Sequence, residues 1–168
     1  SAIAGEKVYF KSSGLSANSS SGIGKFTISN GKCNIGGNIM SMIYGDDFLG
    51  KMNIDTRYQF LGLFKSCVGI VNAINLFLPA TTLADGCYKS MFYECTSLTT
   101  VPALPATTLL SGCYSYMFQG CTSLTTAPEL PATTLAVSCY GKMFSGCTSL
   151  TTSPALPATT LANNCYEY

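Results

Sequence analysis

CTSLTTAPELPATTLAVSCYGKMFSG, residues 121–146, is the stretch that decides the fold, because a near copy of it comes directly before it. Residues 95–120 match it at 18 of 26 positions. The hexapeptide that begins at Cys121 also begins at Cys95 and Cys147, and Leu-Pro-Ala-Thr-Thr-Leu recurs with the same step of 26 residues. A fixed period of this length is the signature of a stacked-repeat architecture.

A less regular copy precedes these repeats. Residues 63–70 align with residues 91–98, at a step of 28. First repeats are commonly atypical because one of their faces meets a cap instead of another repeat. We therefore expect two regions, an N-terminal β cap over residues 1–56 and a repeat array over residues 57–168.

Within one repeat, apolar residues recur at spacings of three to five, and no stretch keeps a helical period for three turns. Pro128 and Pro131 also exclude a helix through the middle of the repeat. This pattern favours a coil of short extended pieces that buries its apolar side against the next coil. Identical residues would then form columns along the stack, about 4.8 Å apart.

The first 56 residues contain no repeat and read as a small β unit. Asn30-Gly31 is typical of a two-residue hairpin turn. The expected elements are a strand over residues 7–11, a loop over 12–24, hairpin strands over 26–29 and 32–35, a strand over 38–44 and a turn over 44–48. The unit is expected to cover the open end of the array.

The other end of the array breaks off within a repeat. In the complete repeats Met-Phe follows Cys-Tyr after two residues, whereas the chain stops at Tyr168, one residue short of the expected Met. We expect an interrupted rung at this end, in a fragment of a parent protein that has further repeats.

Composition and residue types exclude several functions. A net charge of +1 with 10% charged residues argues against nucleic acid. No apolar run reaches the 18 residues of a membrane span, and the absence of His removes Ser-His and Cys-His nucleophiles. We expect no enzyme and no cofactor. Asp46, Asp47 and Asp55 allow either a calcium site or a solvated turn, and the solvated turn is favoured.

Eight of the nine cysteines fall into two columns with the repeat period. These are Cys67, Cys95, Cys121 and Cys147, and Cys87, Cys113, Cys139 and Cys165. Because each column occupies an apolar slot, buried reduced thiols are the favoured interpretation. Disulfides between the columns are an alternative. A metal site is disfavoured because the chain has no Cys-x-x-Cys pair.

The order Cys-x-x-Leu, Leu-Pro, Met-Phe-x-x-Cys resembles the BspA-like, or Treponema-type, leucine-rich repeats. It is met at Cys95, Leu98, Leu104-Pro105, Phe118 and Cys121, and departs from the family pattern at Met117, Cys113 and the strand prolines. The resemblance implies a mainly β fold, a right-handed leucine-rich-repeat solenoid of 26-residue rungs with a small N-terminal β cap. It also implies an extracellular or cell-surface protein, whose parent chain is possibly membrane-anchored outside this fragment, and a role in adhesion.

Repeated polar residues suggest where a partner could bind. A column of tyrosines and a column of threonines are expected on the surface, with variable positions beside the tyrosines. The candidate surface comprises Tyr88, Tyr114, Tyr140, Tyr166, Lys89, Ser115, Thr99, Thr125 and Thr151. The alternative is that Thr reflects strand propensity and that the stacked Tyr rings cover the edge of the core.

Two functional hypotheses follow. The first is a non-catalytic binding or adhesion module for an unknown protein or glycan partner, in a host or in other bacteria. The second is a purely structural stalk or appendage component of a cell or phage particle. Ice binding by the Thr columns is a third, weaker hypothesis, because adjacent threonines point to opposite faces of a strand.

Overall fold

The structure is a computed structural model that describes residues 23–28 and 31–167. Its regular elements all lie in the first half of the chain. They are β1 (Cys33–Asn38), α1 (Ser41–Tyr44), the 3₁₀ helix η1 (Gly45–Phe48), β2 (Asn53–Ile54), β3 (Ile70–Phe77) and β4 (Thr82–Leu83). β1 pairs in parallel with β3, and β2 pairs in parallel with β4.

The predicted mainly β, leucine-rich-repeat solenoid is wrong. From Ala84 to Glu167 the described chain contains only turns, irregular backbone and isolated β-bridges, and the sheets are two small parallel pairs. The prolines at positions 102, 105, 128 and 131 supply no amide donor, so a continuous ladder of strands cannot form there. The opposite side of each repeat folds as consecutive turns, which excludes strands there as well.

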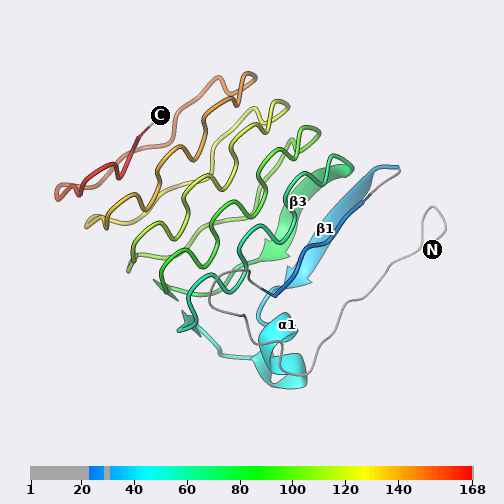
Figure 1. Ribbon diagram of the computed structural model, residues 1–168, viewed down its shortest axis with the longest axis horizontal. Coiled ribbons are helices and arrows are strands. Elements are labelled where there is room, and N and C mark those ends of the chain that lie inside the picture. The colour runs from blue at the N-terminus through cyan, green and yellow to red at the C-terminus, as the bar shows by residue number, and fades with distance from the viewer. Residues whose placement is uncertain (1–22, 29–30, 168) are drawn as a thin grey trace.

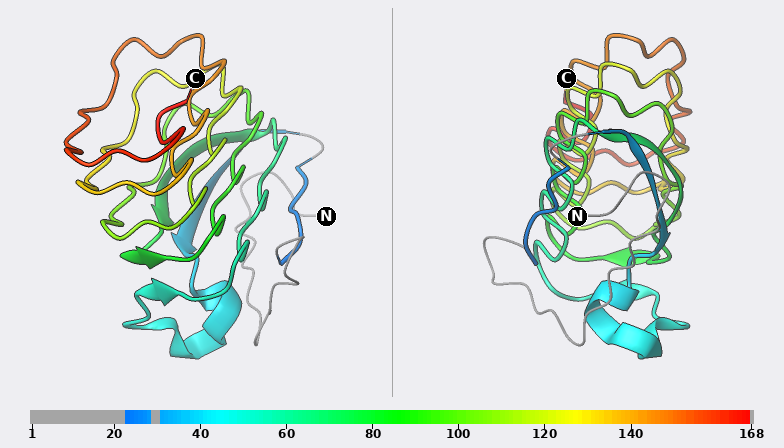
Figure 2. Two further views of the ribbon diagram at one scale, coloured as in Figure 1. Left: turned by 60° about the vertical axis from the view of Figure 1, so that its left-hand side comes forward. Right: turned by 90° about the vertical axis from the view of Figure 1, so that its right-hand side faces the viewer.

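The repeats nevertheless lie one beside the next. Figure 1 shows them as similar loops in a row, with β1 and α1 at one end and the C-terminus at the other, and Figure 2 shows the row from two further sides. We call residues 67–94, 95–120, 121–146 and 147–167 the first, second, third and fourth coils. β1 and β3 close the N-terminal end of this row (Figure 1).

One side of the row is built from turns, and we call it the turn ribbon: residues 58–67, 86–95, 112–121 and 138–147. Along the ribbon, some backbone amides donate to a carbonyl three residues earlier in the same coil, and those between them donate to a carbonyl of the next coil. Met117 N–H donates to the carbonyl of Tyr114 at 3.1 Å, whereas Tyr114 N–H donates to that of Cys139 at 2.9 Å. Every fourth residue has a left-handed backbone, with φ of 60° at Gly112 and 59° at Tyr116. This alternation satisfies backbone groups at every junction between coils.

The core under the turn ribbon contains two columns of parallel aromatic rings. Ring centroids in the first column are 5.3 to 6.0 Å apart, and those in the second 5.6 to 5.8 Å. The first consists of Phe26, Phe64, Phe92, Phe118 and Phe144, and the second of Phe60, Tyr88, Tyr114, Tyr140 and Tyr166. These spacings lie in the range of favourable aromatic pairs. The 26-residue period thus places like rings on like rings.

The eight cysteines of the array are buried, as predicted, and Cys33 is half-buried. One column has a specific role. The thiol of Cys121 donates to the carbonyl of Phe92 at 3.1 Å, and the thiol of Cys147 donates to that of Phe118 at the same distance. Each bond joins the first residue of one coil to the end of the coil two before it, inside the core.

The N-terminal region differs from the prediction. β1 pairs in parallel with β3 and not with the residues before the Asn30-Gly31 turn, so the expected hairpin pairing does not describe β1. Residues 29–30 of that turn lie outside the described residues. The strand expected over 7–11 and most of the loop expected over 12–24 lie outside them as well. The strand expected over residues 38–44 is wrong, because β1 ends at Asn38 and α1 follows. Asn38 causes the change, since its side-chain oxygen accepts the amide of Met40 at 2.9 Å and its carbonyl accepts the hydroxyl of Ser41 at 2.8 Å. Residues 44–48, expected as a turn, form the end of α1 and η1.

The buried core continues across the expected boundary at residues 56 and 57, from Ile39 and Ile54 into Phe60. The division into a cap and an array therefore remains a prediction about sequence regions.

Candidate binding surfaces

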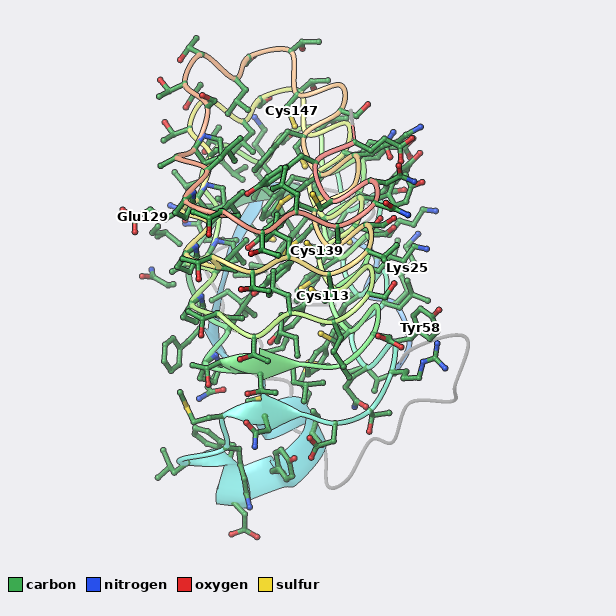
Figure 3. The ribbon with its side chains drawn as sticks, turned by 90° about the vertical axis from the view of Figure 1, so that its left-hand side faces the viewer. Lys25, Tyr58, Cys113, Glu129, Cys139 and Cys147 are labelled. Atoms are coloured by element: carbon green, nitrogen blue, oxygen red, sulfur yellow. The ribbon has the colours of Figure 1, made fainter. Side chains whose placement is uncertain are left out.

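The coils present two opposite sides to solvent. Figure 3 shows Tyr58 and Lys25 on the side of the turn ribbon and Glu129 on the other, with Cys113 and Cys139 between them. We call the second side the Thr–Pro face: residues 99–109, 125–135 and 151–161. The candidate residues from the sequence are distributed over the ribbon, the core and this face.

The tyrosine column belongs to the core, so its expected exposure is wrong for Tyr88, Tyr114 and Tyr140. Their exposed fractions are 0%, 1% and 3%. Tyr166 is half-buried, and its ring stacks on Tyr140. Within the described chain the hydroxyls of Tyr88, Tyr114 and Tyr140 have no hydrogen-bond partner, and burial raises the pKa of Tyr88 and Tyr114 well above the usual value. These side chains pack; they do not present themselves to a partner.

Lys89 and Ser115 lie on the turn ribbon, but both are engaged. The ammonium of Lys89 lies 5.6 Å from the ring centroid of Tyr116, a cation–π arrangement. Ser115 is 4% exposed, and its hydroxyl donates to the carbonyl of Gly141 at 3.2 Å. Both line a polar channel of about 240 Å³ together with Ser111. The channel follows the variable positions of the repeats, yet its hydroxyls largely serve the contact between coils.

Thr99, Thr125 and Thr151 are exposed on the Thr–Pro face. Two of them also link coils. The hydroxyl of Thr99 donates to the carbonyl of Val71 at 2.9 Å, and that of Thr151 donates to the carbonyl of Thr125 at 3.4 Å. Of the candidate residues, these threonines have the most accessible side chains.

Pairing along the Thr–Pro face is interrupted at one junction. β-bridges join Asn72 to Thr100 at the first junction and Thr126 to Thr152 at the third. Between the second and third coils the described residues form no such bridge, and no backbone hydrogen bond joins residues 99–109 to residues 125–135. On the turn ribbon the same two coils remain bonded, for example from the amide of Phe118 to the carbonyl of Met143 at 3.1 Å. The two coils are thus joined along one side and separate along the other.

A groove of about 630 Å³ lies at this interruption. Its walls come from matching positions of the two coils, and Ile74 of the first coil also lines it. The residues that define it are Ile74, Thr99, Val101, Ala103, Thr125 and Glu129. A second hollow of about 330 Å³ shares Ile74 and Ala103 with it and adds Phe77, which is 58% exposed. The two hollows form a continuous, mainly apolar surface.

The backbone that lines the groove has free hydrogen-bonding groups. Among the described residues, the amides of Val101, Ala103, Ala127 and Glu129 donate to no other backbone group. These residues could not be predicted from the sequence, because Thr100 and Thr126 pair differently although they occupy equivalent positions of near-identical repeats. The one available signal was Glu129, the only charged residue of the Thr–Pro face.

Two further kinds of chemical group are the buried thiols and the acidic side chains. Burial raises the pKa of the Cys95 thiol to about 12 and that of the Cys147 thiol to about 11, so neither is a ready nucleophile. Across residues 23–28 and 31–167, no three His, Cys, Asp or Glu side chains gather in a way that could hold a metal ion. The same part of the chain has no helix with the length and apolar character of a membrane span.

Comparison of the chain with protein-family models, with curated proteins and with solved structures finds no match. The resemblance to BspA-like proteins is therefore a prediction that rests on the repeated motif alone.

Proposed function

We propose that the chain is a non-catalytic binding module, extracellular or at a cell surface, and that the groove between the second and third coils engages a partner. The observation that supports this most directly is the interruption of pairing at a single junction of near-identical coils. The groove volume of about 630 Å³ lies within the range of ligand sites in proteins. A purely structural stalk would need bonded coils, but not an open groove.

A pair of matched substitutions tests the proposal. Thr125 and Thr107 are both exposed threonines of the Thr–Pro face, but only Thr125 lines the groove. The fluorescently labelled chain is applied to arrays of host matrix proteins, bacterial surface proteins and glycans. We expect binding to at least one member, weakened at least tenfold by Thr125→Trp and unchanged by Thr107→Trp.

Two outcomes would count against the proposal. Failure to bind across all the arrays would favour the stalk. Equal loss of binding in both variants, with unchanged thermal unfolding, would show that the groove is not the site. The Thr107→Trp control separates filling of the groove from a general effect of an added ring on this face.

A further inference from the structure

We infer that the occupant of the groove is an extended peptide segment that carries a basic side chain, held by backbone hydrogen bonds between the second and third coils. This inference rests on the proposed function and names the class of partner.

The free backbone groups on both walls indicate the form of the ligand. The amides of Val101 and Ala103 on one wall, and those of Ala127 and Glu129 on the other, make no backbone bond within the described residues. An extended peptide presents donors and acceptors along both of its edges, with a rise of about 3.3 Å per residue. Such a segment can bond to one wall or to both, as in peptide recognition by strand addition.

The two flanking junctions show which backbone bonds the middle junction lacks. At the first junction the amide of Thr99 donates to the carbonyl of Val71 at 2.9 Å, and at the third the amide of Thr159 donates to the carbonyl of Thr133 at 3.2 Å. The Thr ends of the coils thus bond to each other at both flanking junctions. At the middle junction the equivalent amide of Thr125 donates to no backbone group within the described residues, and Thr125 lines the groove.

The side chains indicate the composition of the ligand. The walls are apolar apart from Thr hydroxyls, and the neighbouring hollow offers the exposed Ile74 and Phe77. Glu129 is the only charged residue that lines the groove. The nearby coils hold their cations on the turn ribbon instead, where Lys65 and Lys89 lie over tyrosine rings. A peptide with β-branched or other apolar residues and one Lys or Arg near Glu129 complements this surface.

The experiment uses a phage-displayed library of random decapeptides, selected against the whole chain. The selected peptides are expected to be rich in Val, Ile and Thr and to share a Lys or Arg. One is then synthesised in its natural form and with alternate backbone amides N-methylated. We expect the natural peptide to shift the NMR signals of Val101, Ala103, Ala127 and Glu129, and the methylated form to bind at least tenfold more weakly.

Charge is tested with a matched pair of variants. Glu129→Gln is expected to weaken the selected peptide three- to tenfold and to reduce the salt dependence of its binding. Glu94→Gln, at an exposed position of the turn ribbon, is expected to change neither. If Glu129→Gln binds as the native chain does, the assigned role of the charge is wrong.

The outcomes separate this inference from the proposed function. If no peptide is selected, or the methylated peptide binds equally well, while a glycan shifts the groove signals, the peptide inference is overturned and the binding function stands. If neither peptides nor glycans shift the groove signals, or all shifts lie on the turn ribbon, both are overturned.

Discussion

The turn ribbon and the Thr–Pro face are made by the same repeats but are held together differently. On the ribbon, every junction between coils has backbone bonds, such as that from Tyr88 N–H to Cys113 at 3.0 Å and that from Tyr114 N–H to Cys139 at 2.9 Å. On the Thr–Pro face, bonds occur only near the threonines, and the middle junction of the described chain has none. Near-identical sequence thus gives equal contacts along the ribbon and unequal contacts along the Thr–Pro face, although the second, third and fourth coils carry prolines at the same positions.

The largest expected difference between the two sides is their response to alkali. The titratable groups with raised pKa lie under the ribbon. Burial raises the pKa of the Cys95 thiol from 9.0 to about 12, and it also raises those of Cys87, Cys113 and Cys121. Below pH 9 both the folded and the unfolded chain keep these protons. Above pH 9 only the folded chain does, so the free energy of unfolding falls by about 1.4 kcal/mol per pH unit for each such thiol.

Four thiols of this kind would remove a typical stability of about 5–15 kcal/mol within a few pH units. We therefore expect cooperative unfolding between pH 9 and pH 12 under reducing conditions, followed by circular dichroism. In Cys113→Ala the slope of the unfolding free energy against pH should fall by about 1.4 kcal/mol per pH unit. A free energy of unfolding that stays constant over this range would contradict the buried thiols.

The second test compares side-chain removal on the two sides. Phe118→Ala removes a fully buried ring from between Phe92 and Phe144, and should lower the free energy of unfolding by about 3–5 kcal/mol. Thr125→Ala, in the wall of the groove, should change it by less than about 0.5 kcal/mol because the side chain is exposed. Urea unfolding measures both. Similar losses from both variants would mean that the Thr–Pro face is more closely packed than the groove implies.

The smallest expected effects concern the left-handed positions of the ribbon. Gly112 and Ser138 occupy equivalent places in successive coils, with φ of 60° and 52°. A Cβ at Gly112 would come no nearer than 3.9 Å to the Cβ of Ser115, so strain in the backbone is the main cost. Gly112→Ala should destabilise the chain by about 1 kcal/mol, and Ser138→Gly should stabilise it by about 0.5–1 kcal/mol.

Thermal unfolding of this pair sharpens the comparison, because the control lies on the opposite side. Thr107→Gly, at an exposed position of the Thr–Pro face, should destabilise the chain where Ser138→Gly stabilises it. Effects of one sign at Gly112 and Ser138 would show that these positions do not need the left-handed backbone.

The sequence predicted what depends on the repeat period. It identified the stacking of like residues, seen in the column that contains Phe92 and Phe118, and the burial of the array cysteines. It did not predict the turn ribbon, because left-handed positions are occupied there by residues as different as Gly112, Tyr116 and Lys142. Period alone does not separate a turn from a strand.

The candidate surface was only partly predictable, because the repeat period does not show whether a side chain faces the core or the solvent. A tyrosine between a cysteine and a variable residue can face either way, and Tyr114 is buried although Ser111, three residues before it, is exposed. Thr99 and Thr125 are exposed as expected. The groove depends on a difference in pairing between coils that share the same threonines, so it could be found only from the arrangement of the coils.

The middle junction also has a mechanical consequence. The second and third coils are bonded along the turn ribbon and unbonded along the Thr–Pro face. The backbone bonds around Phe118 and Met143 can therefore act as a hinge between the two coils. A load that bends the ends of the row toward the side of Glu129 narrows the groove, and the opposite load widens it without breaking a backbone bond of the turn ribbon. The curvature of the row of coils therefore determines the width of the groove. A ligand bound in the groove would fix both the curvature of the row and the width of the groove. Tension along the row would change the shape of the binding site before it changed the rest of the array.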